Sequence, residues 1–206
     1  MRGDFAPWPW ISAATPRAPG PPRWGGVLAW DIALRAPKRV ASLTVLSTPH
    51  PTALGHALKT ADQLKKSWYI GMFQIPALPE RLLAGRVGAF TRRAGIPKEA
   101  ANRYGRRFAT ADDLRGPINW YRAMFRKDGV TGEHAGNGII TVPTTFVWGR
   151  RDPALGRTAA EETEVYVHAP YKFIELDAGH WLPEREANRV AEAVIDRISS
   201  VPGQGA

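Results

Sequence analysis

Two short apolar runs near the C-terminal end, Thr144–Trp148 and Lys172–Leu176, constrain the fold more than any other feature of the sequence. Each run is bounded by turn-forming residues and has the length of a buried strand. A polar residue follows each strand exit, Asp152 after the first run and His180 after the second. In open parallel α/β sheets, functional groups collect beyond the carboxyl ends of the strands. The pattern predicts an acid–histidine pair, in which the carboxylate orients the imidazole.

Further elements of an α/β fold flank these two runs. Val40–Leu46 is nearly continuous in apolar, β-branched residues and predicts another buried parallel strand. A helix is predicted before it, ending at Arg35, and another over Thr158–Val167. The closing helix, Glu184–Ser199, has one face predicted to pack on the sheet, because its apolar residues recur every three to four positions: Ala187, Val190, Ala191, Val194, Ile195 and Ile198.

A long stretch without convincing strands separates the predicted strands. From about Thr52 to Gly138 the expected elements are all helices: Ala53–Lys66, Ser67–Phe73, Pro79–Arg93, Pro97–Thr110 and Asp112–Arg126. One crossover between parallel strands needs far fewer residues. We therefore expect residues 52–138 to form an inserted helical lid (cap), and residues 24–51 and 139–200 to form the core.

The N-terminal segment 1–23 differs from the rest of the chain. It contains six prolines, which lack a backbone donor and restrict the residue before them. A disordered proline-rich arm is expected here, with one short extended piece. Pro7 and Pro9 interrupt the apolar residues near the start, which argues against a signal peptide. Order is expected from Trp24, where Gly25-Gly26 suits a tight strand-to-helix elbow.

Composition excludes several classes of function. The formal net charge is +9, but the basic residues are scattered pairs rather than one stripe, so no nucleic-acid partner is expected. The absence of cysteine excludes disulfides and thiol nucleophiles and fits a cytoplasmic location. No run approaches a membrane span, and no membrane partner is expected. His56, His134 and His168 lack metal-ligand spacing and no nucleotide-binding glycine pattern occurs, so neither a metal nor a cofactor is expected.

From Trp24 to about Ile198, the sequence resembles the α/β-hydrolase fold, specifically its epoxide-hydrolase-like branch. Four kinds of segment carry the resemblance: WGGVLAWDIALRAPKRVASLTVLSTPHP, the lid's SWYIGMFQIPALPERLL and INWYRAMFR, the acid turn VPTTFVWGRRDP, and the histidine turn LDAGHWLPE. The resemblance implies the C-terminal part of a parallel sheet flanked by helices, that is, a partial α/β-hydrolase fold with an inserted helical lid.

The resemblance also implies roles for matched residues. Asp152 would orient His180, and His180 would activate the water that hydrolyses a covalent ester intermediate. Tyr69 in SWYIGMF and Tyr121 in NWYR match the two lid tyrosines that bind and protonate an epoxide oxygen. The backbone N–H of Trp24 would contribute to the oxyanion hole. From the residues alone, both tyrosines also suit an aromatic lid core.

The chain departs from the family pattern at the nucleophile. Arg23 stands where the family has the aspartate of His-Asp-Trp-Gly-Gly or the serine of Gly-x-Ser-x-Gly. A guanidinium stays protonated and has no lone pair for attack. The upstream strands and the His-Gly-x-Pro loop are also missing. A truncated or frame-shifted N-terminus, a wrong start and a real rearrangement all remain open as explanations.

The sequence therefore predicts a hydrolase-family chain, by resemblance an epoxide hydrolase, that is catalytically defective for want of a nucleophile. The complete enzyme would take a small apolar epoxide or ester. The alternatives are a non-catalytic ligand-binding or interaction module, and an ester or haloalkane hydrolase relative if a nucleophile were restored. The Val40–Leu46 strand is expected to be an unpaired edge, which offers a route to self-association. Asp177 is the alternative to Asp152 as the carboxylate that would pair with His180. His50 is expected in a solvated turn.

Overall fold

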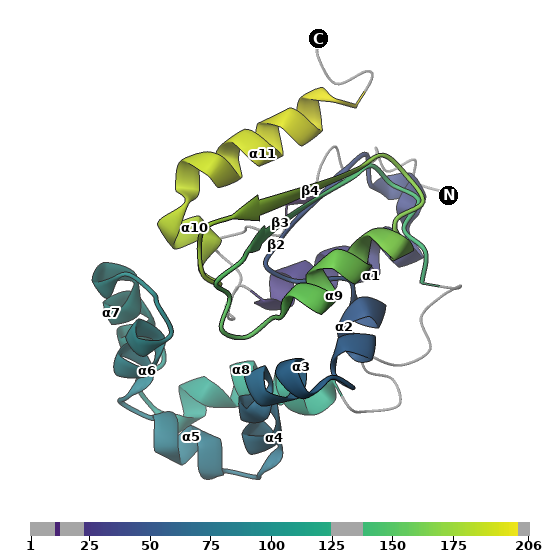
Figure 1. Ribbon diagram of the computed structural model, residues 1–206. Coiled ribbons are helices and arrows are strands. Elements are labelled where there is room, and N and C mark those ends of the chain that lie inside the picture. Colours follow the sequence, from purple (N-terminus) through teal and green to yellow (C-terminus); the bar gives the residue numbers. More distant parts are fainter. Residues whose placement is uncertain (1–10, 13–22, 125–137, 202–206) are drawn as a thin grey trace, which may run out of the picture.

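The computed structural model describes residues 11–12, 23–124 and 138–201, which contain a parallel β-sheet of four strands (Figure 1). The strands lie in chain order: β1 (Ile11–Ser12), β2 (Leu43–Leu46), β3 (Thr144–Gly149) and β4 (Tyr171–Leu176). In the middle of the sheet, Val45 pairs with Phe146, which pairs with Phe173. Every residue of β2 and β3 is buried, as expected for parallel strands covered on both faces.

Helices cover both faces of the sheet (Figure 1). On one face, α1 (Arg23–Arg35) and α9 (Arg157–Glu162) pack around the fully buried side chain of Trp30. On the other face lie α10 (Leu182–Arg185) and α11 (Ala187–Ser199). Two short 3-10 helices, η1 (Pro37–Arg39) and η2 (Thr163–Tyr166), complete this part, and α2 (Pro51–Ala57) packs beside α9. The predicted α/β architecture is confirmed.

The packed face of α11 differs from the predicted one. Val190 and Ala193 are buried against Val147, whereas Ile195 is 61% exposed. Arg197 takes a place in the buried face, because its guanidinium donates to the Thr145 hydroxyl at 2.8 Å and to the Thr144 carbonyl at 3.1 Å. A pattern based on apolar residues alone does not reveal a buried arginine. The buried face of α11 is therefore shifted by about one residue from the predicted face.

A separate group of helices, α3 to α8, lies beyond the carboxyl ends of the strands; we call it the helical unit (Figure 1). Its helices are α3 (Ala61–Lys66), α4 (Trp68–Gln74), α5 (Leu78–Leu83), α6 (Val87–Arg93), α7 (Lys98–Arg107) and α8 (Ala111–Ala123). It has its own apolar core, which includes Phe73, Phe108 and Ile118. Trp24, from the start of α1, is part of the same core and joins the helical unit to the sheet.

Two predicted lid helices are each divided in the structure. The expected helix Ala53–Lys66 breaks into α2 and α3, because the Thr60 hydroxyl accepts the Gln63 N–H and caps a new helix. The expected helix Pro79–Arg93 breaks at Gly85, whose φ of +69° is left-handed. The strand predicted over Val40–Leu46 begins only at Leu43.

The N-terminal expectations need correction where the chain is described. Ile11–Ser12 form β1, which fits the one short extended piece expected in the arm, whereas Arg23, expected to belong to the arm, is already part of α1. The rest of segment 1–23 lies outside the described residues. Since Ile11 and Ser12 pair with Leu43 and Thr44, β2 is not the unpaired edge that the sequence predicts.

A buried ion pair holds α5 and α8 of the helical unit together. Arg122 donates to both carboxylate oxygens of Glu80, at 2.6 and 3.1 Å, and also to the backbone carbonyls of Phe73 and Ile75. The Glu80 side chain is only 6% exposed. The hydrogen bonds from Arg122 outweigh burial and lower the pKa of Glu80 below its usual value.

Glu80→Gln is expected to destabilise the protein by about 1–3 kcal/mol at neutral pH, because the Arg122 guanidinium loses its charged partner. A carboxyl group whose pKa is lowered on folding contributes stability above its unfolded pKa and loses that contribution as the pH falls through the lowered pKa. The wild-type advantage should therefore shrink in acid. Urea denaturation at several pH values measures it. Asp112→Asn is the control, since the Asp112–Arg115 pair is 80% and 72% exposed and should add nothing measurable; a pH-independent difference for Glu80→Gln would contradict this account.

Candidate active site

The turns that follow β3 and β4 pack directly against each other. The Arg150 N–H donates to the Leu176 carbonyl at 3.0 Å, and the Arg151 N–H donates to the Ala178 carbonyl at 2.9 Å. A Cβ atom at Gly149 would lie within 2.5 Å of the Ala178 carbonyl oxygen, so only glycine permits this approach. We call residues 149–156 the acid turn and residues 177–181 the histidine turn.

Asp152 and His180 form a buried hydrogen-bonded pair between these turns. Asp152 Oδ2 lies 2.7 Å from His180 Nδ1, and the two residues are 3% and 7% exposed. Asp152 Oδ1 accepts the N–H groups of Ala154 at 2.7 Å and Leu155 at 3.0 Å, which leaves Oδ2 directed at the imidazole. An ionised carboxylate can only accept, so Nδ1 carries the proton and Nε2 is left to act as a base.

The rival acid, Asp177, is placed elsewhere. Its carboxylate is 58% exposed and contacts Arg150 at 2.8 Å and Arg151 at 3.2 Å. The hydrogen bond from Arg150 lowers the pKa of Asp177. Asp177 therefore belongs to a surface ion-pair cluster, and Asp152 is the carboxylate that meets His180.

A cavity of about 710 Å³ lies between the two turns and the helical unit. His180 lines it together with Tyr69 from α4 and Tyr121 from α8. The two tyrosine rings meet edge to face with centroids 5.9 Å apart, and both contact the Phe73 ring. Most of the remaining wall is apolar, from Leu83, Val87, Phe90, Phe108, Leu114 and Ile118. The structure thus brings both predicted tyrosines into the same cavity as the predicted histidine.

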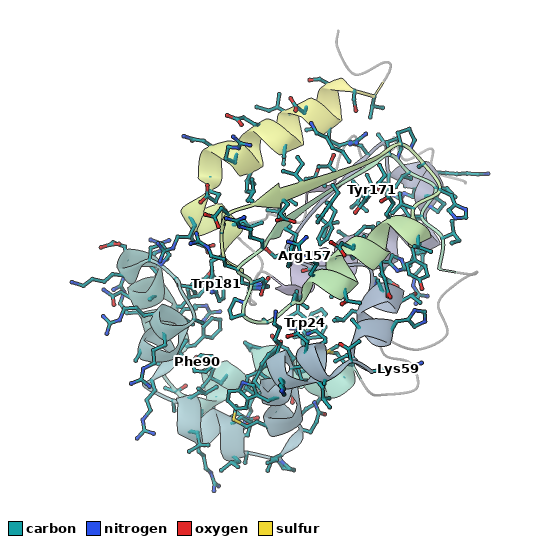
Figure 2. The ribbon with its side chains drawn as sticks, viewed as in Figure 1. Trp24, Lys59, Phe90, Arg157, Tyr171 and Trp181 are labelled. Atoms are coloured by element: carbon teal, nitrogen blue, oxygen red, sulfur yellow. The ribbon has the colours of Figure 1, made fainter. Side chains whose placement is uncertain are left out.

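Trp24 lies at the junction of α1 with this wall. Its ring packs against Tyr121 at 5.1 Å and Trp120 at 5.3 Å between centroids. Figure 2 shows that Trp24 and Trp181 both lie between the sheet and the helical unit. Trp24 is the second residue of α1, and N–H groups in a first helical turn have no acceptor within the helix. Its side chain does not line the cavity, so any contribution to an oxyanion hole would come from the backbone.

Glycine also allows α1 to approach the end of β2. A Cβ atom at Gly26 would lie 2.6 Å from Thr48 Cβ. Next to Thr48, Ser47 has a left-handed φ of +54° and donates its hydroxyl to the His180 carbonyl at 2.9 Å. Ser47 therefore fixes the backbone of the histidine turn, a contact that the sequence analysis missed.

His50 is fully buried, so its expected place in a solvated turn is wrong. Its Nδ1 accepts the Thr52 N–H at 3.2 Å and caps α2. Its ring stacks on Tyr166 at 4.8 Å and meets Trp30 edge to face. These contacts make His50 part of the packing beneath α2.

The helical unit is also bonded to the histidine turn and to α10, which follows it. The Trp181 indole N–H donates to the Ala94 carbonyl at 2.9 Å, and Arg185 donates to the Gly95 carbonyl at 3.0 Å. Tyr104 on α7 donates to Glu184 at 3.1 Å. Burial, followed by the negative charge of Glu184, raises the pKa of Tyr104 to about 12, so its hydroxyl remains a donor at neutral pH.

Two negative findings apply to the described part of the chain. Within residues 11–12, 23–124 and 138–201, no group of three or more histidine and acidic side chains could hold a metal ion. No helix among the described residues is long and apolar enough to cross a membrane.

Comparison with known proteins identifies relatives across most of the chain. No protein-family profile matches it. It is 29% identical over 190 residues to the AB hydrolase superfamily protein YfhM of Bacillus subtilis, covering 86% of this chain and 64% of that protein. It is 30% identical over 188 residues to epoxide hydrolase 3 of Xenopus tropicalis, covering 84% of this chain and 50% of that one.

Comparison of the fold with solved structures leads to proteins of the same kind. A solved structure of novel epoxide hydrolases of the α/β-hydrolase superfamily, from metagenomes of hot environments, superposes with a TM-score of 0.69 at 25% identity, covering 86% of this chain and 65% of that one. This chain thus spans between half and about two thirds of the length of these relatives. Sequence and architecture agree: the chain has a partial α/β-hydrolase fold, and it is similar to proteins of the epoxide-hydrolase-like branch of that fold.

Proposed function

We propose that this chain carries the water-activating and oxygen-binding residues of an epoxide hydrolase site without a nucleophile at position 23. One observation carries the proposal: the 2.7 Å bond between Asp152 and His180 stands in the wall of a cavity that also contains Tyr69 and Tyr121. In this proposal the helical unit is the lid over the site.

In a complete site of this kind, a carboxylate oxygen attacks one epoxide carbon and the carbon–oxygen bond breaks. Tyr69 and Tyr121 would hold the epoxide oxygen, and one of them would donate the proton that turns it into a hydroxyl. His180 Nε2 would then take a proton from water, whose oxygen attacks the ester carbonyl. The ester bond breaks as His180 returns its proton to the leaving diol oxygen, and the carboxylic acid that is left loses its proton to restore the carboxylate and the tyrosine hydroxyl.

Arg23 supplies no attacking group, because a protonated guanidinium has no lone pair to give. What remains is attack of the epoxide by water with the help of His180. General-base assistance of this kind could give at most about 10²–10⁴-fold over the uncatalysed reaction. We therefore propose that the chain is inactive or nearly so.

Purified protein incubated with styrene oxide is expected to give no diol above the buffer background, as measured by chromatography. His180→Ala should be indistinguishable from the wild type in this assay. Diol formation that is clear in the wild type and lost in His180→Ala would show that the chain works without a residue-23 nucleophile and would overturn the proposal of inactivity.

A second candidate function, a non-catalytic ligand-binding module, is favoured by the cavity itself. Its volume of about 710 Å³ and its largely apolar wall are those of a small-molecule site. Trp68 and Trp181 line the cavity, so tryptophan fluorescence can report occupancy during titration with phenyl-1,2-ethanediol. Saturable quenching without turnover supports the module; no saturable signal with the diol or with styrene oxide removes it.

The remaining proposals concern setting and partners. We propose a cytoplasmic protein, in keeping with the absence of cysteine, whose ligand is a small apolar epoxide or ester. Because β1 pairs with β2, the outer strands of the described sheet are β1 and β4, and association between chains through the sheet would use one of these two edges.

A further inference from the structure

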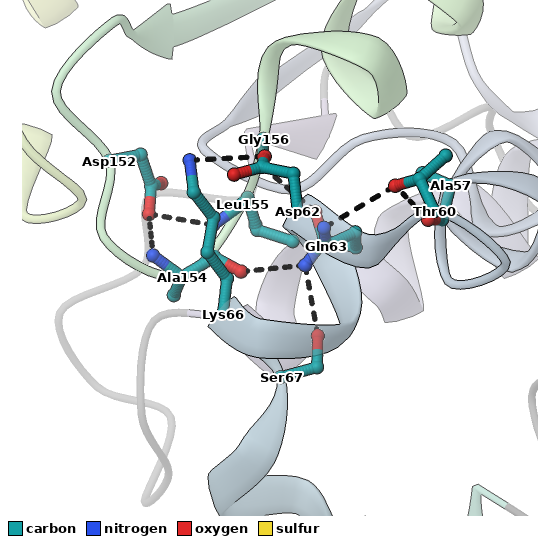
Figure 3. Close-up of polar contacts among 10 residues, drawn as sticks. All are labelled: Ala57, Thr60, Asp62, Gln63, Lys66, Ser67, Asp152, Ala154, Leu155 and Gly156. Atoms are coloured by element: carbon teal, nitrogen blue, oxygen red, sulfur yellow. Dashed lines mark hydrogen bonds and ion pairs between the residues drawn. The ribbon is translucent and has the colours of Figure 1, made fainter.

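Gln63, on α3 of the helical unit, is bonded to the acid turn. Its side chain is 1% exposed, although glutamine usually lies at the surface. Its Nε2 donates to the Ala154 carbonyl at 2.8 Å, and its Oε1 accepts the Gly156 N–H at 2.8 Å. Figure 3 shows Gln63 beside the stretch of the acid turn that runs from Ala154 to Gly156.

The local sequence explains how α3 presents this side chain. The Thr60 hydroxyl donates to the Ala57 carbonyl at 2.7 Å and accepts the Gln63 N–H at 3.3 Å, so α3 starts at a defined residue (Figure 3). The Ser67 hydroxyl, one turn further on, accepts a second hydrogen bond from Gln63 Nε2 at 2.9 Å. Gln63 is therefore held by hydrogen bonds at its backbone N–H and at its side-chain amide.

The same short stretch of backbone holds Asp152. Asp152 Oδ1 accepts the N–H groups of Ala154 and Leu155, both of which belong to the 154–156 segment that Gln63 holds. Moving residues 154–156 would turn the carboxylate and change the 2.7 Å contact between Oδ2 and His180 Nδ1. The hydrogen bonds of the Gln63 side chain go to Ser67, Ala154 and Gly156, so its link to Asp152 and His180 runs through the backbone of the acid turn.

We infer that Gln63 is a positioning residue for the Asp152–His180 pair, through which the helical unit sets the geometry of the acid. This inference rests on the proposed role of that pair. A purely structural glutamine would support the fold without affecting the bond at His180. If Gln63 positions the pair, loss of its two contacts with the acid turn must change the hydrogen bond between Asp152 and His180.

The test reads the bond directly. The Nδ1 proton of a histidine bonded to a buried carboxylate gives a strongly downfield proton NMR signal, here assigned to His180 by its loss in His180→Ala. In Gln63→Met, which keeps the side-chain length but has no amide, we expect this signal to move upfield or to be lost. Ser67→Ala is the matched control: it removes one bond of Gln63 but leaves both contacts with the acid turn, and the signal should stay in place.

Gln63→Glu provides a second variant of nearly the same shape. An ionised carboxylate still accepts the Gly156 N–H but cannot donate to the Ala154 carbonyl, so the signal should again move. An unchanged signal in both folded Gln63 variants overturns the inference. So does failure of both variants to fold, since Gln63 would then be a folding residue. The measurement needs no substrate, so it stands apart from the outcome with styrene oxide.

Discussion

Arg23→Asp is expected to give the chain a covalent reaction with styrene oxide that the wild type lacks. An aspartate carboxylate supplies the lone pair that the guanidinium does not have. Position 23 is the first residue of α1, directly before Trp24, whose ring packs against Tyr121 in the cavity wall. A negative side chain is also favoured in the first turn of a helix, so the substitution suits the position electrostatically.

The ester is best detected where it cannot be hydrolysed. In the double variant Arg23→Asp, His180→Gln, the base that activates water is absent, and the intact protein should gain the mass of one styrene oxide molecule. With His180 present, the adduct should turn over to diol. Arg23→Asn is the matched control, because an uncharged amide is a far weaker nucleophile than a carboxylate. If the double variant shows no adduct while a known epoxide hydrolase consumes the same substrate, the role assigned to position 23 is wrong.

Gly149→Ala is expected to destabilise the protein by about 3 kcal/mol or more, the upper range for overpacking a buried site. The added methyl would collide with the carbonyl oxygens of Gly179 and Ala178, both backbone atoms that cannot rotate away. The acid and histidine turns would have to separate, and the Asp152–His180 bond would lengthen.

Gly179→Ala is the matched control on the opposite turn. Its added methyl would come no nearer than 3.9 Å to a neighbouring atom, the Arg151 carbonyl oxygen, which is ordinary contact. We expect a change within about 1 kcal/mol. Urea denaturation of the two variants makes the comparison, and equal stabilities would show that the turns are not packed as described.

The pairing of Asp152 with His180 could be predicted because it follows from the sheet alone. Both residues come just after apolar runs, and neighbouring parallel strands bring such exits together. Tyr69 and Tyr121 were placed by their resemblance to lid tyrosines, not by periodicity. Their position in the cavity depends on how the helices fold back over the sheet.

Other features depend on contacts that no local pattern encodes. Gln63 lies in a helix of six residues, and its partners Ala154 and Gly156 are 91 and 93 residues away. His50 stands between two prolines, a pattern typical of a turn, yet Trp30 and Tyr166 enclose it. The strand β1 has only two residues, too few for any alternation to be recognised.

The helical unit is hydrogen-bonded to both turns that border the cavity: Gln63 donates to the Ala154 carbonyl of the acid turn, and the Ala94 carbonyl accepts from Trp181 of the histidine turn. The helical unit therefore cannot rotate away from the sheet as a rigid body without breaking both hydrogen bonds. Any change in the shape of the helical unit would then occur at the connections between its short helices. Two such connections contain Ala77 and Gly85, which have left-handed φ values of +60° and +69°. Movement of α5 between those two residues would allow the cavity to accept ligands of different width, while the hydrogen bond between Asp152 and His180 is kept.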